Sequence, residues 1–239
     1  MDSLLMRIRV GTSGYSYKEW KGTFYPEDLP AAKMLPYYAE RFDSVEINNT
    51  FYRMPDAKMV AKWGEQVPDE FTFVLKAPQR ITHQKKLAGA GADVSYLFDA
   101  ARALGPKMGP ILFQLPPYLR KDAATLYDFV AELPEQGKVA FEFRHASWFD
   151  EDIYAILRER DIALCAADTD EVTDVDALLV PTASWGYMRL RRAEYAAEEL
   201  EAWAARVQRQ AWSEAYVFFK HEDEGKGPRF AVAFRAQLR

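Results

Sequence analysis

Short stretches of this chain alternate between apolar residues and charged or amide residues with a period of two. The polar members are Glu46 and Asn48 in 44–49, Glu142 and Arg144 in 139–144, and Arg189 and Arg191 in 186–191. Successive side chains of a strand point to opposite faces, so each polar set shares one face while the apolar set packs on the other. Buried ions are costly unless they are paired or serve a site. The pattern therefore predicts a protein built around a polar, ion-lined centre.

Strand-like and helix-like stretches alternate along the whole chain. The predicted strands are 7–12, 44–49, 71–76, 111–115, 139–143, 162–167, 186–190 and 215–219. The predicted helices are 33–41, 57–66, 94–104, 122–133, 151–160, 196–210 and 230–238, with Asp122 as an N-cap and with prolines expected at the ends of elements. The stretch after the sixth strand, 169–184, shows no full helix and is expected to be irregular.

Eight strands with helices between them indicate a parallel sheet, and eight is the number that closes a barrel. The sequence therefore predicts an α/β fold, a closed parallel (β/α)8 TIM-type barrel, as one domain over 1–239. The alternative is an open doubly wound sheet, which would normally carry a Gly-rich nucleotide turn after its first strand. Gly11-Thr-Ser-Gly14 does not fit the spacing G-x-G-x-x-G, which favours the barrel.

Composition narrows the class of protein. The chain has 239 residues, 49% of them hydrophobic, so it can bury a large core without disulfide bonds. A net charge of −5 argues against a broad nucleic-acid-coating surface. The single cysteine, Cys165, lies in an apolar run and is expected to be a small core residue in a reducing compartment. Without an apolar leader or a run of about 20 apolar residues, we expect a cytoplasmic protein with no membrane association.

Several motifs carry a resemblance to a known family. They are Gly11-Thr-Ser-Gly-Tyr15, Trp20-Lys-Gly-Thr-Phe-Tyr-Pro26, Val45-Glu-Ile-Asn-Asn-Thr-Phe-Tyr-Arg53, Gln114-Leu-Pro-Pro117 and Ala140-Phe-Glu-Phe-Arg-His-Ala-Ser-Trp148. Through them, 10–148 resembles the YecE-like family, known as domain of unknown function 72, and the later strands resemble it more loosely. The resemblance implies a TIM-type barrel without an established activity. The chain departs from the family pattern at Arg191-Arg192, where His-Gly is usual, and at 220–223 after the last strand.

In barrels of this type the site lies at the C-terminal ends of the strands. Three carboxylates are predicted there as catalytic groups: Glu142, Glu46 and Asp168. Glu142 is the candidate general acid/base, because burial of a strand-end carboxylate can raise its pKa. Structural alternatives remain open for all three: Glu142 as the partner of Arg144 or Arg189, Glu46 as the partner of Lys76, and Asp168 as a helix cap.

Other side chains at the same strand ends are predicted to bind substrate. Lys76, Arg144 and Arg189 suit a phosphate or carboxylate group, and Asn48 and Gln114 would orient the ligand. Among the loop aromatic residues, Tyr15, Tyr52 and Trp148 are the candidates to wall a cleft that stacks on a sugar or a base. The three histidines, His83, His145 and His221, show no metal-ligand spacing, so no metal and no cofactor are expected. The alternative is a metal site at Glu142, His145 and Asp168, which the neighbouring Arg144 would oppose.

Three functional hypotheses follow. The first is an enzyme of the hydrolase or lyase type that applies acid/base chemistry to a small anionic, sugar- or nucleotide-like substrate. The second is a nucleic-acid-binding or nuclease-like barrel, by analogy at the level of the fold. The third is a non-catalytic protein that binds a metabolite. The sequence leaves the oligomeric state open.

Overall fold

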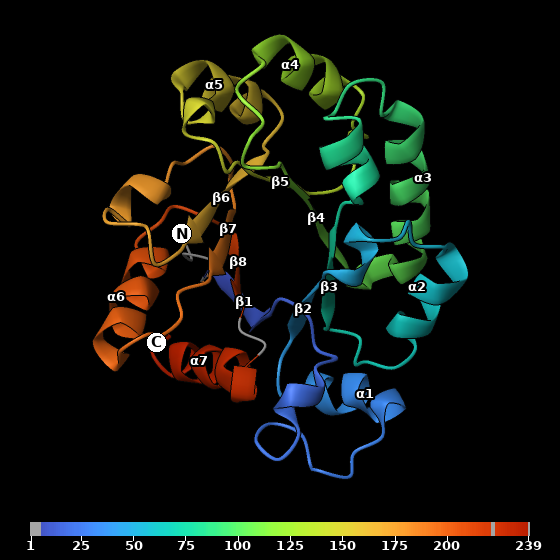
Figure 1. Ribbon diagram of the computed structural model, residues 1–239, viewed down its shortest axis with the longest axis vertical. Coiled ribbons are helices and arrows are strands. Elements are labelled where there is room, and N and C mark those ends of the chain that lie inside the picture. The colour runs from blue at the N-terminus through green and yellow to red at the C-terminus, as the bar shows by residue number, and fades with distance from the viewer. Residues whose placement is uncertain (1–5, 221–222, 239) are drawn as a thin grey trace, which may run out of the picture.

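The computed structural model describes residues 6–220 and 223–238, in which a ring of parallel strands is surrounded by helices (Figure 1). The strands are β1 (Arg7–Thr12), β2 (Ser44–Ile47), β3 (Thr72–Lys76), β4 (Met108–Gln114), β5 (Val139–Glu142), β6 (Ala163–Asp168), β7 (Gly186–Leu190) and β8 (Glu214–Phe219). The α-helices are α1 (Met34–Ala39), α2 (Ala57–Gly64), α3 (Gly91–Ala101), α4 (Ala123–Ala131), α5 (Glu151–Glu159), α6 (Ala197–Gln208) and α7 (Lys226–Arg235). The predicted (β/α)8 TIM-type barrel is confirmed.

The strands pair in parallel in the order β1-β8-β7-β6-β5-β4-β3-β2. The ring closes between β1 and β2 through a parallel bridge that joins Ser13 and Glu46, where the Gly14 amide donates to the Glu46 carbonyl oxygen at 2.7 Å. Gly11 permits this closure, because a Cβ there would lie 2.0 Å from the carbonyl oxygen of Ser44. The seam thus depends on a close backbone approach that a side chain at Gly11 would block.

The barrel has two apolar layers. The larger layer lies between the strands and the helices, and a smaller cluster fills the lumen. The lumen cluster includes Val74, Leu112, Ala140, Ala163, Cys165, Trp185, Tyr187, Tyr216 and Phe218. Because a parallel barrel buries both faces of its strands, apolar residues stand on both sides, and the buried carboxylates Glu46 and Glu142 lie at the C-terminal end of the lumen.

Several element boundaries differ from the predicted ones for local reasons. The strand predicted at 111–115 begins at Met108, so Pro110 lies inside β4 rather than at its end, next to a register irregularity between β3 and β4 at Phe73 and Leu75. A strand tolerates proline at such an irregular position, because the missing N–H is not needed for the ladder there. The last helix begins at Lys226 rather than 230.

Other local predictions are confirmed. Asp122 caps α4 by accepting a hydrogen bond from the Thr125 amide at 3.0 Å. The stretch 169–184 contains only a 3₁₀ turn, Asp176–Leu178, so the segment after the sixth strand is irregular. None of the helices in the described residues combines the length and apolar character that a membrane span needs.

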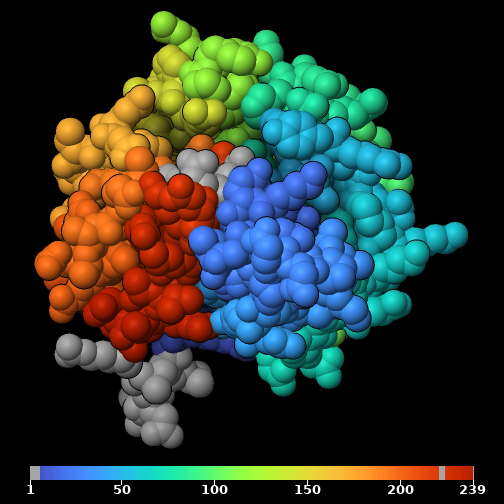
Figure 2. Space-filling view, turned by 60° about the horizontal axis from the view of Figure 1, so that its bottom comes forward, coloured from blue at the N-terminus to red at the C-terminus, as the bar shows by residue number. Residues whose placement is uncertain are grey.

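A loop from the first part of the sequence meets a turn from its last part on one face of the barrel. The 3₁₀ turn Lys18–Trp20, in the long loop after β1, contacts the 3₁₀ turn Asp223–Gly225 before α7. Figure 2 shows the loop and α1 in blue beside α7 in red. The first and last parts of the sequence therefore close the helical layer together.

Candidate functional site

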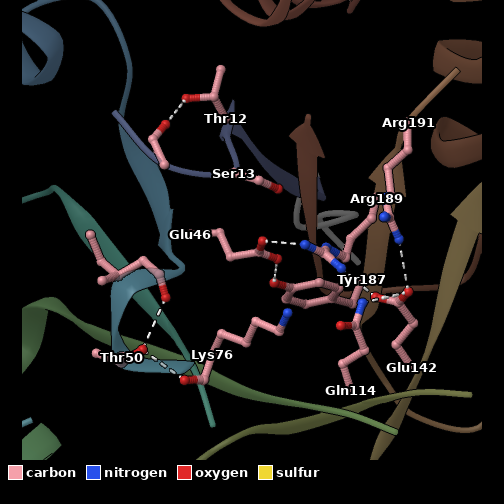
Figure 3. A network of polar contacts seen from close by, with 12 residues as sticks. Thr12, Ser13, Glu46, Thr50, Lys76, Gln114, Glu142, Tyr187, Arg189 and Arg191 are labelled. Carbon is pink, nitrogen blue, oxygen red and sulfur yellow. Dashed lines mark hydrogen bonds and ion pairs between the residues drawn. The ribbon is translucent and has the colours of Figure 1, made fainter. Parts of the chain in front are cut away.

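Arg189 lies at the centre of a buried ionic cluster at the C-terminal end of the lumen (Figure 3). Its guanidinium donates to Glu142 Oε2 at 2.5 Å and to Glu46 Oε1 at 2.9 Å. The three side chains are at most 2% exposed, although they come from β7, β5 and β2. One arginine between two carboxylates satisfies the requirement that buried ions be paired and hydrogen-bonded.

Glu142 accepts hydrogen bonds from three other side chains. Besides Arg189, the amide of Gln114 donates to its Oε1 at 2.9 Å and Arg191 donates to the same oxygen at 3.1 Å. Burial opposes ionisation of the carboxyl, but the charges of Arg189 and Arg191 outweigh burial and lower its pKa to about 2. The expectation of a raised pKa at Glu142 is therefore wrong. The physical reason is that the guanidinium groups of Arg189 and Arg191 both contact the Glu142 carboxylate inside the barrel.

Glu46 occupies the other side of the cluster. Tyr187, two residues before Arg189 on β7, donates its hydroxyl to Glu46 Oε2 at 2.5 Å. Burial opposes the charge on Glu46, yet the Arg189 charge and the Tyr187 hydrogen bond leave its pKa below the usual value. Burial and the Glu46 charge raise the pKa of the Tyr187 hydroxyl well above its ordinary range. The cluster therefore contains two ionised carboxylates, with a phenol held in its protonated form.

Lys76, the last residue of β3, points its amino group towards this cluster (Figure 3). The side chain is 9% exposed, and its Nζ lies over the ring of Phe51, 4.1 Å from the ring centroid. Across residues 6–220 and 223–238, Nζ has no hydrogen-bond or ion-pair partner. Burial and the nearby Arg189 charge lower its pKa to about 8. Lys76 is thus a partly desolvated amine whose charge changes close to neutral pH.

A hollow of about 480 Å³ opens beside the cluster. Glu142, Cys165 and Arg191 line it, and the exposed Arg144, just after β5, adds a second guanidinium. Asp170 and Glu171 line it from the irregular segment after β6, with their side chains exposed to solvent. The lining therefore combines arginine groups, one buried carboxylate and two solvated carboxylates. Burial raises the pKa of the Cys165 thiol well above its usual value, so this side chain is not a thiolate.

A smaller hollow of about 220 Å³ lies at the ends of β1 and β2. It is lined by Tyr15 and Asn48, two residues predicted to bind substrate. The Nδ2 atom of Asn48 is buried without a hydrogen-bond partner in the described residues, so it is a donor open to a ligand. Tyr52 is 76% exposed and packs edge-on against Phe51, with 5.2 Å between the two ring centroids.

Asp168 and Trp148, two further predicted site residues, lie away from the cluster and line neither hollow. Asp168 faces the helical layer, where its carboxylate accepts hydrogen bonds from Arg192 at 2.8 Å and from Tyr195 and Trp203 at 3.0 Å. Trp148 is 1% exposed, stacks on Phe143 and donates its indole N–H to a backbone carbonyl at 2.7 Å. The described contacts of both side chains are those of structural residues, and neither lines the hollow beside Glu142.

The structure adds residues that the sequence-based prediction did not include. Tyr187 shares the phase of Arg189 in β7, so extending the alternation by one step would have found it. Phe51 gives no such signal, because its ring reaches Lys76 from the 3₁₀ turn Asn49–Phe51 after β2. Arg191 shares the phase of Arg189 in the alternating stretch 186–191, although it was not among the predicted substrate-binding residues. His221 of the predicted strand-eight turn lies outside the described residues.

Comparison with known proteins places this barrel in a family. The sequence model of the family described as "Protein of unknown function DUF72" matches residues 9–239. The chain belongs to the DUF72 family. The match extends through the later strands, where the sequence motifs are looser, and it includes Glu46, Glu142 and Arg189.

Two bacterial relatives carry names of the same kind. UPF0759 protein YecE of Escherichia coli (strain K12) is 33% identical over 143 residues, which are 59% of this chain and 50% of YecE. UPF0759 protein YunF of Bacillus subtilis is 28% identical over 155 residues, 62% of this chain and 54% of YunF. This DUF72 chain thus aligns with about half the length of each relative.

Solved structures agree with the fold. A DUF72 family protein from Thermotoga maritima superposes with a TM-score of 0.83 at 26% identity, covering 96% of this chain and 98% of that one. A DUF72 family protein from Enterococcus faecalis gives a TM-score of 0.81 at 19% identity, covering 97% and 95%. A glycoside hydrolase family 5 enzyme from Prevotella bryantii, with a TM-score of 0.56, 10% identity and coverage of 99% and 97%, shares the barrel fold alone.

Proposed function

We propose that this DUF72 protein is an enzyme that binds a small anionic substrate at the C-terminal mouth of its barrel and acts on it by acid/base chemistry. The observation that carries the proposal is Glu142. This carboxylate is 1% exposed and bound by Arg189 and Arg191, yet it lines a hollow of about 480 Å³. A polar cluster needed only for stability would not have to border a hollow large enough for a metabolite.

The charges at the mouth favour an anionic group. With Lys76 protonated, the cluster has three positive charges, from Lys76, Arg189 and Arg191. Glu46 and Glu142 supply two negative charges, which leaves one positive charge in excess. Arg144 adds a further positive charge at the rim of the hollow. Within the described residues, Arg144 has no carboxylate partner, and Arg191 uses one nitrogen on Glu142. Free guanidinium N–H groups suit the bidentate binding of a phosphate or a carboxylate.

The rest of the lining favours a hydroxyl-rich substrate. Asp170 and Glu171 present carboxylates on another wall of the hollow, and carboxylates accept hydrogen bonds from sugar hydroxyls. Outside the lining of this hollow, the exposed ring of Tyr52 offers a stacking surface beside Phe51. A sugar- or nucleotide-like anion satisfies both requirements, and hydrolysis or elimination is the reaction type that we propose.

The proton-transfer role falls to Lys76 in this proposal. With a pKa of about 2, Glu142 is ionised at neutral pH and has no proton to donate, so its part is to hold Arg189 and Arg191 in place. Lys76, with a pKa of about 8, exists in both protonation states near neutral pH, which is the property required of a general acid or base. This assignment moves the acid/base role from Glu142 to Lys76.

Binding of inorganic phosphate and of a panel of sugar phosphates, measured by calorimetry, tests the anion site. We expect Arg144→Gln to weaken binding about tenfold, the loss of one charge-assisted hydrogen bond. Arg7→Gln is the matched control, because Arg7 is an exposed arginine at the opposite end of the barrel. Equal affinities in the two variants, or no anion binding in the unmodified protein, would contradict the proposal.

Turnover of any ligand found in this way then separates an enzyme from a binding protein. Loss of turnover in Lys76→Met with binding retained supports acid/base chemistry at Lys76. Tight binding without turnover would favour the non-catalytic hypothesis instead. Binding of short oligonucleotides that falls steeply with salt would favour the nucleic-acid hypothesis.

A further inference from the structure

Lys76 stands apart from the other charged groups of the lumen because no described residue pairs with its amine, although two carboxylates lie in the same cluster. Both of those carboxylates, Glu46 and Glu142, are bound to Arg189. The described contact of Nζ is with the face of the Phe51 ring. An aromatic ring attracts the ammonium but does not neutralise its charge as a carboxylate would. The arrangement presents a primary amine that is positioned but not neutralised.

Lys107 shows what a structural buried lysine looks like in the same protein. Its side chain is 13% exposed, close to the burial of Lys76. Its Nζ donates to the carbonyl oxygens of Gly64 at 2.8 Å and Val67 at 2.9 Å, and pairs with Asp69 at 3.3 Å. Burial alone therefore does not leave a lysine unpartnered in this fold. The contrast singles out Lys76.

Charged groups on several strands and loops at the mouth of the barrel influence the pKa of Lys76. Arg189 on β7 and Lys220 after β8 favour the neutral amine, and Glu46 on β2 and Glu142 on β5 favour the ammonium. His83, in the turn Arg80–Gln84 after β3, also senses the Lys76 charge. Together with burial, these charges lower the pKa of Lys76 to about 8, so a fraction of the amine is neutral at pH 7. A neutral primary amine is a nucleophile toward carbonyl carbon.

We propose that Nζ of Lys76 forms a Schiff base with the carbonyl group of the substrate. This inference rests on the proposed function and narrows its substrate to a small anionic aldehyde or ketone. The neutral amine attacks the carbonyl carbon, the C–O π bond breaks, and the oxygen leaves as water after the carbinolamine collapses. Overall, one lysine ammonium and one carbonyl give one protonated imine and one water molecule, so no further reactant is needed.

The neighbouring groups suit this intermediate. The protonated imine keeps the single positive charge of the lysine, so the ionised Glu46 and Glu142 stabilise it as they would the ammonium. The exposed Arg144 and the partly exposed Arg191 would hold the anionic end of the substrate. The imine withdraws electrons from the adjacent carbon, which is the activation that an elimination or a carbon–carbon bond cleavage requires.

Reductive trapping tests the inference directly. The protein is incubated with dihydroxyacetone phosphate and cyanoborohydride at pH 7, and each lysine is then scored by peptide mass spectrometry. With a pKa of about 8 instead of the ordinary 10.5, Lys76 carries about 300-fold more neutral amine at pH 7. Allowing for the lower basicity of the amine, we expect labelling at Lys76 at least about tenfold faster than at exposed lysines. Labelling at Lys107, the internal control, should be negligible.

The uncharged analogue dihydroxyacetone separates this inference from the proposed function. Faster labelling of Lys76 by the phosphate ester than by dihydroxyacetone supports both. Equal labelling by the two ketones supports the Schiff base and contradicts the anion site. Calorimetric binding of dihydroxyacetone phosphate that depends on Arg144, without preferential labelling of Lys76, overturns the Schiff base and leaves the proposed function standing. In Lys76→Met, labelling of the other lysines should be unchanged.

Discussion

Arg189 on β7 and Glu142 on β5 form a buried ion pair at 2.5 Å although β6 separates their strands in the sheet. Arg189 reaches further, to Glu46 on β2, so one guanidinium links three strands across the lumen. The interior of this end of the barrel is therefore an ionic network rather than an apolar plug. We therefore expect the stability of the protein and its dependence on pH to be governed by the charges of this network.

Removal of the central arginine should strongly lower the free energy of unfolding. Arg189→Leu leaves Glu46 and Glu142 buried without their main partner, which costs about 3–5 kcal/mol in the free energy of unfolding. Chemical denaturation measures it. The control is Arg206→Leu, which removes an exposed ion pair with Asp176 and should cost about 0–1 kcal/mol. Similar losses in both variants would show that the central network is not the stronger interaction.

Acid should destabilise the protein through Glu142. Its pKa in the folded protein, about 2, lies below the unfolded value of 4.5, so the unfolded chain binds more protons between these two values. The free energy of unfolding therefore falls as the pH drops from 4.5 towards 2, by about 3 kcal/mol for this group. Urea titrations across this range should show a smaller pH slope in Glu142→Gln. An unchanged slope in the variant would contradict the depressed pKa.

Alkaline pH should stabilise the protein through Lys76. Its pKa is lowered on folding from 10.5 to about 8, so the unfolded chain binds the extra proton between these values and stability rises with pH in that window. Lys76→Met should lose this rise and should be more stable at pH 7, by about 1–3 kcal/mol. The melting temperature against pH measures both effects.

Lys107→Met provides the contrast, because Lys107 has three described partners and its loss should lower stability at every pH. Equal destabilisation by the two substitutions would mean that Lys76 is an ordinary structural lysine. A gain in stability with a loss of activity at Lys76 is the signature expected of a strained functional group.

The seam of the barrel should be sensitive to a single methyl group. Gly11→Ala places a Cβ 2.0 Å from the Ser44 carbonyl oxygen, so β1 and β2 must separate, and we expect a loss of more than about 2 kcal/mol. Gly64→Ala is the matched control, because its Cβ would have its nearest contact at 3.8 Å, at the end of α2, and helix propensity favours alanine by up to about 1 kcal/mol. Thermal unfolding of both variants tests the difference.

Some features of the site could be predicted from alternation alone. Glu46, Glu142 and Arg189 each stand between apolar neighbours, so their shared phase marked them as facing the lumen before any contact was known. Asp168 could not be placed in this way. The residues before it, 162–167, are apolar on both faces of the strand. In such a strand the sequence does not show which side chains face the lumen and which face the helices.

The sequence by itself determined the eight strands with helices between them, the irregular segment after β6 and several residues that share the polar face of the lumen, because local alternation and turn residues encode these. Only the tertiary structure decided the partners. Arg189 binds both carboxylates, so the pKa of Glu142 falls, and the amine of Lys76 has no ion-pair partner among the described residues. The pKa of a buried group depends on the charges around it in space, and those charges come from strands far apart along the chain.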